Sequence, residues 1–208
     1  MALYKTRFLK GLRTGDYEPI YFSEFVDYLK RARDDEHKFL LLTAYLTGLR
    51  GIEAKKILKQ DVMRHGHYIR LRIHTAKRGV TRFVLLPARN PYMKEFMAYV
   101  EKQVFPKAYL FPSFAKVRNI RHKFRKANYE ARIGRVNDET GELEPFSFYT
   151  FRHNILTLLS EYGADILDID IYKGAKLSRA YGSAVYYIHR SANRMQKIAK
   201  IINKIMKT

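Results

Sequence analysis

The segment Leu46-Thr47-Gly48-Leu49-Arg50-Gly51-Ile52-Glu53 joins two predicted helices. The apolar run from His37 to Thr47 predicts a buried helix, and Gly48 is expected to end it because glycine readily takes a left-handed backbone conformation. A second, short helix is expected from Gly51 to Leu58. Arg50 therefore lies at a turn, although on position alone an arginine after a helix-ending glycine is more often a surface or cap residue.

Beyond this turn, the chain predicts a small sheet. The segment from Tyr68 to His74 alternates apolar and polar residues, as a half-buried strand does. Residues Arg82 to Leu86 supply another strand, and the turn Lys77-Arg78-Gly79 separates the two. We therefore expect an antiparallel β-sheet of two or three strands with a basic outward face.

Helical patterns outnumber strand patterns in the rest of the chain. Gly163 and Gly174 are expected to close two of the later helices. The sequence thus predicts an α+β, mainly helical fold. The further helices are expected after Ser23, beyond Pro91, from about Phe114 to Arg132, from Thr150 to Tyr162, from Asp165 to Tyr172 and from about Ser183 to Lys207.

The composition indicates a polyanionic partner. The 208 residues suit one globular domain with a short arm, and 40 Lys and Arg against 20 Asp and Glu give a formal charge of +20. Double-stranded DNA is the first candidate partner. No apolar run approaches the roughly 18 residues of a spanning helix, so no membrane partner and an intracellular location, in the cytoplasm or nucleoid, are expected. The absence of Cys excludes disulfides and Cys-based zinc sites.

The predicted helix from about Phe114 to Arg132 carries a cationic stripe. Charge runs are usually solvated faces, but this one has a single sign and no acid before Glu130, which favours phosphate binding. An acidic stretch, Asp138 to Glu144, is expected to form an exposed loop. The stripe predicts DNA-binding roles for Lys116, Arg118, Arg121, Lys123, Arg125 and Lys126.

Two segments in the first half resemble catalytic motifs of the tyrosine recombinases. The segment around Arg50 is similar to the family's TGLRxxE box, and the resemblance implies that Arg50 is the first catalytic arginine. Thr75-Ala76-Lys77 resembles the segment that carries the family's β-hairpin lysine, which makes Lys77 the candidate acid for the leaving 5′ oxygen. Taken alone, a lysine at a hairpin tip is usually solvated.

Two segments in the second half resemble further motifs of the family. Tyr149-Thr150-Phe151-Arg152-His153 resembles HxxRH, so Arg152 matches the second catalytic arginine and His153 the residue beside it. Tyr149 departs from the usual histidine, as in integrases of archaeal viruses and plasmids. A phenol can hydrogen-bond a phosphate oxygen but is a poor base at neutral pH. In the alternative reading, Tyr149 and His153 are a helix-start and a core residue.

The last motif, Tyr187-Ile188-His189, resembles the family's YxH signature and implies that Tyr187 is the nucleophile. Tyr186 is adjacent, so the assignment rests on register. The family's second His or Trp is missing near Gly174-Ala175-Lys176, where Lys176 is the nearest group able to contact a phosphate.

These residue types suit phosphodiester transesterification. Two guanidiniums can bind the non-bridging oxygens, where negative charge grows in the transition state. A tyrosine that attacks phosphorus conserves the bond energy, so no ATP, metal or other cofactor is expected. His65, His67 and His74 have no nearby carboxylate ligands in the sequence, and a metal site there is not expected.

An amphipathic helix is expected at the C-terminus, at about residues 190–208. Its apolar stripe could cap its own core, whereas the family resemblance implies packing on a neighbouring protomer bound to DNA. The stripe is formed by Met195, Ile198, Ile202, Ile205 and Met206.

Taken together, the resemblance implies the tyrosine recombinase catalytic-domain fold for residues 21–208, after a basic N-terminal arm at residues 1–20. The roughly 35 residues before the first buried helix are too few for the separate N-terminal domain of the family, so a fragment or a minimal member is expected. The implied function is site-specific DNA recombination by a dimer or tetramer on DNA. The alternatives are a catalytically impaired DNA-binding module of the same fold and a type IB topoisomerase-like relaxing enzyme.

Overall fold

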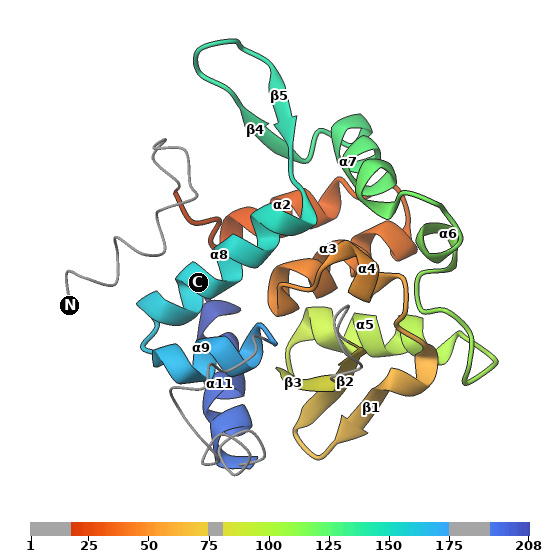
Figure 1. Ribbon diagram of the computed structural model, residues 1–208, viewed down its shortest axis with the longest axis vertical. Coiled ribbons are helices and arrows are strands. Elements are labelled where there is room, and N and C mark those ends of the chain that lie inside the picture. The colour runs from red at the N-terminus through yellow and green to blue at the C-terminus, as the bar shows by residue number, and fades with distance from the viewer. Residues whose placement is uncertain (1–17, 75–80, 175–191) are drawn as a thin grey trace.

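The structure is a computed structural model, and it describes residues 18–74, 81–174 and 192–208 (Figure 1). Helices form most of it, as the sequence predicts. In chain order the helices are α2 (Phe22–Lys30), α3 (Asp35–Thr47), α4 (Gly51–Ala54), the 3-10 turn η1 (Lys59–Asp61), α5 (Pro91–Glu101), α6 (Pro112–Ala115), α7 (Ile120–Glu130), α8 (Phe148–Glu161), α9 (Ile166–Tyr172) and α11 (Ala192–Ile205).

The expected antiparallel sheet has three strands in the order β1-β2-β3. Arg72 lies opposite Phe83 in the register of β2 and β3. The residues of β2 alternate between buried and half-buried, so one face of the sheet belongs to the core. The strands are β1 (Val62–His65), β2 (Tyr68–His74) and β3 (Thr81–Pro87).

A second sheet was not expected. Strands β4 (Gly134–Val136) and β5 (Leu143–Pro145) pair around the acidic stretch that the sequence predicts as a loop, and the hairpin projects from the body in Figure 1. A Cβ on Gly134 would lie 2.3 Å from the carbonyl oxygen of Glu144, so glycine permits this close pairing. Strands of three residues are too short to produce a recognisable alternation.

Helix α3 lies at the centre of the core. The Asp34 side chain begins it by accepting a hydrogen bond of 2.7 Å from the backbone N–H of His37, and residues 39–47 are buried throughout. The ring of Tyr45 stacks on Phe25 of α2, with 3.9 Å between centroids. Helix α3 also contacts α8, and the α8 residues Arg152 and Ile155 lie against Gly48 at the C-terminal end of α3.

The single predicted helix from Phe114 to Arg132 is wrong, because α6 and α7 are separate. Pro112 occupies the first turn of α6, and that helix ends at Ala115. The Asn119 side chain then accepts a hydrogen bond of 3.1 Å from the backbone N–H of His122 and begins α7. Proline and the Asn cap therefore override the apolar periodicity that ran through both helices.

Two other predicted helix boundaries are also corrected. Helix α4 ends at Ala54 instead of Leu58, because Leu58 is extended and its backbone N–H donates to the Asp61 carboxylate at 2.9 Å. Helix α2 begins at Phe22, with Tyr21 in place of Ser23 as N-cap.

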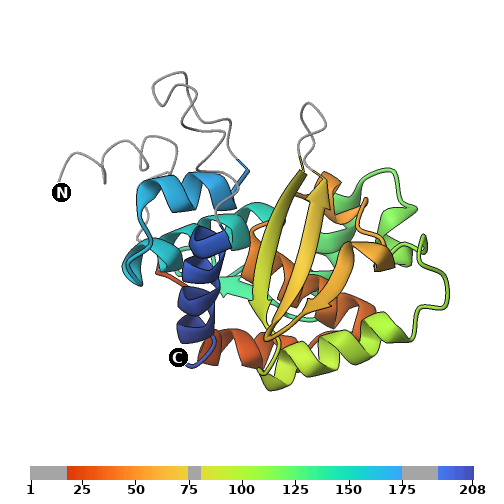
Figure 2. The ribbon, with the colours of Figure 1, turned by 90° about the horizontal axis from the view of Figure 1, so that it is seen from below.

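The C-terminal helix α11 packs on its own domain, against β3 and α8 (Figure 2). The apolar stripe predicted from the sequence faces the core, and Ile202 and Ile205 are fully buried. Residues 183–191, where this helix was expected to begin, lie outside the described residues, as do residues 1–17 of the N-terminal arm. Within the described ranges, no helix is long and apolar enough to cross a membrane.

Candidate active site

Gly48 shapes the turn that carries Arg50. It ends α3 with φ of 56°, and a Cβ at this position would lie 2.8 Å from Ile155 Cγ2 and 3.3 Å from the Cα of Arg152. A side chain is therefore excluded both by the left-handed backbone and by the packing of α8. This close approach brings the Arg50 turn next to the second predicted arginine.

Glu53 orients Arg50. The Glu53 carboxylate is fully buried and accepts two hydrogen bonds of 2.9 Å from Arg50, one from its backbone N–H and one from Nη1. The Arg50 side chain remains 43% exposed. Its guanidinium is thus held at one nitrogen while much of its surface faces solvent.

Arg152 of α8 lies against the same turn. Its Nη1 donates to the carbonyl oxygen of Gly48 at 2.7 Å, and its Nη2 donates to the carbonyl oxygen of Lys173 at 2.6 Å. Both acceptors stand at the C-terminal ends of helices, α3 and α9, where carbonyl groups lack helical partners. The structure therefore brings the two predicted catalytic arginines to one place.

A third arginine, Arg82 of β3, lies behind them. It is only 6% exposed, and its guanidinium donates to the carbonyl oxygens of Thr47 and Tyr172. Its Nη2 also lies 3.5 Å from Oε2 of Glu53. Neither Arg82 nor Glu53 is among the site residues predicted from the sequence.

The electrostatics of this cluster favour an anionic ligand. Burial, followed by the neighbouring charges of Arg50 and Arg82, lowers the pKa of Arg152 to about 10. Burial likewise lowers the pKa of Arg82, although the Glu53 carboxylate opposes this shift. One buried carboxylate lies near three guanidiniums and binds only Arg50 and Arg82 directly, so the cluster keeps an excess of positive charge that an anion such as a phosphate could balance.

Tyr149 and His153 stand side by side on α8. Tyr149 is 61% exposed, and its ring centroid lies 4.0 Å from that of half-buried His153. Burial, followed by the Arg152 charge, lowers the pKa of His153, which favours the neutral imidazole. Neither residue belongs to the closed core, so both side chains are available beside Arg152.

A buried carboxylate fixes the loop end of the β2–β3 hairpin. Asp61 accepts from Nε of Arg72 at 2.6 Å and lies 3.4 Å from Nε2 of His74, whose Nδ1 is 3.3 Å from the Thr81 hydroxyl. Lys77, predicted at the tip, lies outside the described residues. Lys176 and Tyr187 also lie outside them, so the structure places neither beside the arginines.

The predicted DNA-binding residues do not form one helical stripe. Lys116 caps α6, Arg118 lies between the helices, and the other four belong to α7. A Cβ on Gly51 would lie 3.2 Å from Ile120, so the start of α7 adjoins the Arg50 turn.

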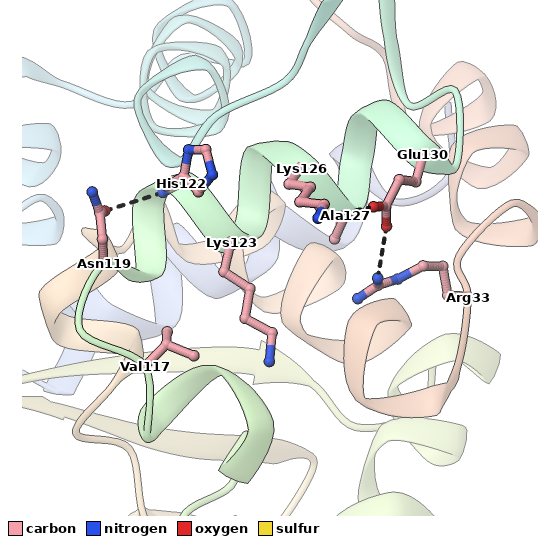
Figure 3. Close-up of a pocket in the computed structure, with 8 residues that line it drawn as sticks. All are labelled: Arg33, Val117, Asn119, His122, Lys123, Lys126, Ala127 and Glu130. Atoms are coloured by element: carbon pink, nitrogen blue, oxygen red, sulfur yellow. Dashed lines mark hydrogen bonds and ion pairs between the residues drawn. The ribbon is translucent and has the colours of Figure 1, made fainter.

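The basic side chains on α7 differ in whether they already contact another protein group, and Figure 3 shows two of them, Lys123 and Lys126. The Lys123 ammonium donates to the carbonyl oxygen of Ser113 at 2.6 Å, and Lys126 lies 3.8 Å from Glu130. Both line a groove beside α7. Arg121 and Arg125 are exposed and form no ion pair among the described residues. They are therefore better placed to bind phosphates than the two lysines.

Residue spacing alone could have identified Arg82. It occupies the same face of β3 as the buried residues Val84 and Leu86, because residues two apart in a strand point to one side. An arginine on a core-facing position needs buried partners. For metals, no group of three His, Cys, Asp or Glu side chains in the described ranges could hold an ion.

The mainly helical domain with its small antiparallel sheets has the fold of a tyrosine recombinase catalytic domain. The sequence model of the phage integrase family matches residues 22–193, and the chain therefore belongs to this family. A comparison with curated proteins finds no match.

Several solved structures share the fold. The chain is 19% identical to the integrase from mycobacterium phage Brujita, with a TM-score of 0.53 over 93% of this chain and 64% of that one. It is 17% identical to the XerH site-specific recombinase bound to a palindromic difH substrate in a post-cleavage complex, with a TM-score of 0.55 over 88% of this chain and 51% of that one. The XerA recombinase is 20% identical, with a TM-score of 0.55 over 90% of this chain and 66% of that one. The chain thus spans between half and two thirds of these proteins.

Proposed function

We propose that the chain is a site-specific DNA recombinase or integrase that cleaves and rejoins DNA through a 3′-phosphotyrosine intermediate. The observation that carries the proposal is the joint placement of Arg50 and Arg152 around the C-terminal end of α3, beside one buried carboxylate. This cluster has an excess of positive charge, and both arginines are accessible, since Arg50 is partly exposed and Arg152 is half-buried. It is suited to a phosphodiester, which offers two non-bridging oxygens to two arginines.

Each proposed step uses a named side chain. Arg50 and Arg152 bind the non-bridging oxygens and stabilise their growing charge. The Tyr187 hydroxyl loses its proton to solvent water as its oxygen attacks phosphorus, the bond from phosphorus to the 5′ oxygen breaks, and Lys77 protonates the leaving 5′ oxygen. A 5′ hydroxyl from another strand then reverses the reaction. Tyr149, His153 and Lys176 are proposed phosphate contacts, and no metal, ATP or other cofactor takes part.

The proposed partner is double-stranded DNA inside the cell. Arg121 and Arg125 on α7 would contact phosphates next to the site, because both are exposed and the start of α7 adjoins the Arg50 turn. XerH is described as bound to its difH substrate, which supports a DNA-binding role for the shared fold.

Strand exchange requires at least two active protomers, so we propose a dimer or tetramer on DNA. The C-terminal helix is a proposed contact between protomers. In the single chain α11 covers its own core, and its transfer to a neighbour would first have to break its contacts with β3 and α8.

Covalent capture tests this proposal. The chain is incubated with a pool of nicked duplexes of randomised sequence, with a chelator present, and protein–DNA adducts are isolated on a denaturing gel. We expect adducts enriched in one sequence, and we expect that sequence to support exchange between two duplexes. Relaxation of supercoiled plasmid without sequence preference would favour the topoisomerase-like alternative. DNA binding without any adduct would favour the catalytically impaired module.

A further inference from the structure

Arg82 is a buried charge with no place in the reaction proposed above. It lies on the core-facing side of β3, beneath the arginine cluster, and its Nε has no hydrogen-bond partner among the described atoms. Burying a guanidinium is unfavourable, and an apolar side chain of similar volume often stabilises a core as well or better. Stability alone is therefore a weak explanation for an arginine at this position.

Arg82 and Arg152 form hydrogen bonds in the same pattern. Arg82 bridges the carbonyl oxygens of Thr47 and Tyr172, and Arg152 bridges the carbonyl oxygens of the next residue in each segment, Gly48 and Lys173. The end of α3 is thus connected to the end of α9 by two neighbouring guanidinium bridges. The buried Arg82 bridge fixes the distance between the ends of α3 and α9. The Arg152 bridge, which lies on the more exposed side, must fit this same distance.

Arg82 also reaches the residue that orients Arg50. Its Nη2 is 3.5 Å from Oε2 of Glu53, the same oxygen that accepts the backbone N–H of Arg50 at 2.9 Å. The other Glu53 oxygen accepts from Nη1 of Arg50. One buried side chain is thereby connected to the supports of both proposed catalytic arginines.

We propose that Arg82 is a positioning residue, which sets the separation and orientation of Arg50 and Arg152 by bridging the ends of α3 and α9 and by holding Glu53. The inference rests on the proposed function, since it gives a role to Arg82 only if the two arginines act on a phosphodiester. Arg82 itself is too buried to touch DNA. Its effect must therefore fall on the rate of cleavage and leave DNA affinity unchanged.

The main test compares Arg82→Lys with wild type in single-turnover cleavage of a nicked duplex captured from the randomised pool, at saturating protein. Lysine keeps the charge beside Glu53 but cannot bridge two carbonyl groups with a planar fork. We expect cleavage to slow by about 10- to 100-fold, the scale of a small misplacement of catalytic groups. The dissociation constant for DNA should not change. Arg70→Lys, on the neighbouring strand β2, is the matched control and should cleave as wild type does.

A double-mutant cycle separates positioning from general damage. Arg82→Lys is combined with Arg50→Lys and, separately, with Arg152→Lys. If Arg82 acts through these arginines, its effect should shrink to about threefold or less in either background, because interacting residues are not additive. Multiplicative effects would overturn the proposal, since they indicate a role independent of the arginines.

The remaining outcomes are also decisive. If the wild-type protein cleaves DNA and Arg82→Lys cleaves it at the same rate, this inference alone is overturned. Absence of wild-type cleavage would overturn the proposed function and this inference with it. Arg82→Met is the second variant, and we expect it to fold and bind DNA but to cleave even more slowly than Arg82→Lys. If both variants are unfolded at the assay temperature, Arg82 serves the fold and the proposal is contradicted.

Discussion

The carboxylate of Asp168 in α9 and the guanidinium of Arg194 in α11 lie 2.6 Å apart, and the Asp168 side chain is fully buried. Lys197 adds a second contact to Asp168 at 3.1 Å. Hydrogen bonds from Lys197 to Asp168 and Asp165 raise the pKa of Lys197. The C-terminal helix is therefore held on its own domain by charge as well as by apolar packing.

Asp168→Asn should lower the free energy of unfolding by about 2 kcal/mol, because it removes the charge that Arg194 and Lys197 share. The loss is limited because both cations remain partly solvated. Urea unfolding measures the loss. Asp165→Asn is the matched control: Asp165 is more exposed, and asparagine can still cap α9, so its cost should stay below about 1 kcal/mol. Equal stability of Asp168→Asn and wild type would show that the ion pairs do not hold the helix.

Truncation after Ala192 should unfold the free protein. The helix buries Ile198, Ile201, Ile202 and Ile205, and at about 1.5 kcal/mol or more for each side chain the loss is comparable with the whole stability of a domain, about 5–15 kcal/mol. Circular dichroism and thermal melting test this expectation. Deletion of Lys207 and Thr208 alone, both exposed, should leave the melting temperature unchanged. A truncated chain that melts like wild type would mean that α11 is not part of its own core.

Arg50→Ala and Arg152→Ala should each slow cleavage by about 10²-fold or more, the usual loss when one donor to a transition-state oxygen is removed. DNA affinity should fall far less, because many other cations would remain to contact the DNA backbone. Single-turnover cleavage and a binding titration distinguish the two effects. Cleavage by either variant at nearly the wild-type rate would remove that arginine from the site.

DNA binding should weaken steeply with salt, and the slope should identify the cations on α7 that contact phosphate. Each lost contact reduces the slope of log K against log salt by about 0.9. We expect that reduction for Arg121→Ala and Arg125→Ala. Lys123→Ala should change the slope less, because the Lys123 ammonium is already bound to the carbonyl oxygen of Ser113. A larger change in slope for Lys123→Ala than for Arg121→Ala and Arg125→Ala would show that the groove of Figure 3 is the face that binds DNA.

The sequence predicts the parts of the site that depend on local signals. Gly48 identifies the end of α3, and the order of the motifs identifies Arg50 and Arg152, which the structure brings together. Local signals were also present where the helix prediction failed, since Pro112 and Asn119 mark the starts of α6 and α7. The apolar periodicity continues through both helices and so obscures these caps.

The rest depends on contacts between residues far apart in the chain. Arg82 donates a hydrogen bond to the carbonyl oxygen of Tyr172, which lies 90 positions further along the chain, and Asp168 accepts one from Arg194, which lies 26 positions further along. No local pattern encodes such pairs. The strand register does place Arg82 on the buried face, but only the folded chain shows which groups satisfy it.

The identity of the covalently linked residue tests the central claim most directly. Adducts formed with a nicked duplex are digested, and the peptide that carries the nucleotide is identified by mass spectrometry, with Tyr187→Phe and Tyr186→Phe as a matched pair. We predict a phosphotyrosine at position 187, no adduct with Tyr187→Phe despite normal DNA affinity, and a normal adduct with Tyr186→Phe. An adduct that persists in Tyr187→Phe, or that maps to another residue, would contradict the assignment of Tyr187 as nucleophile.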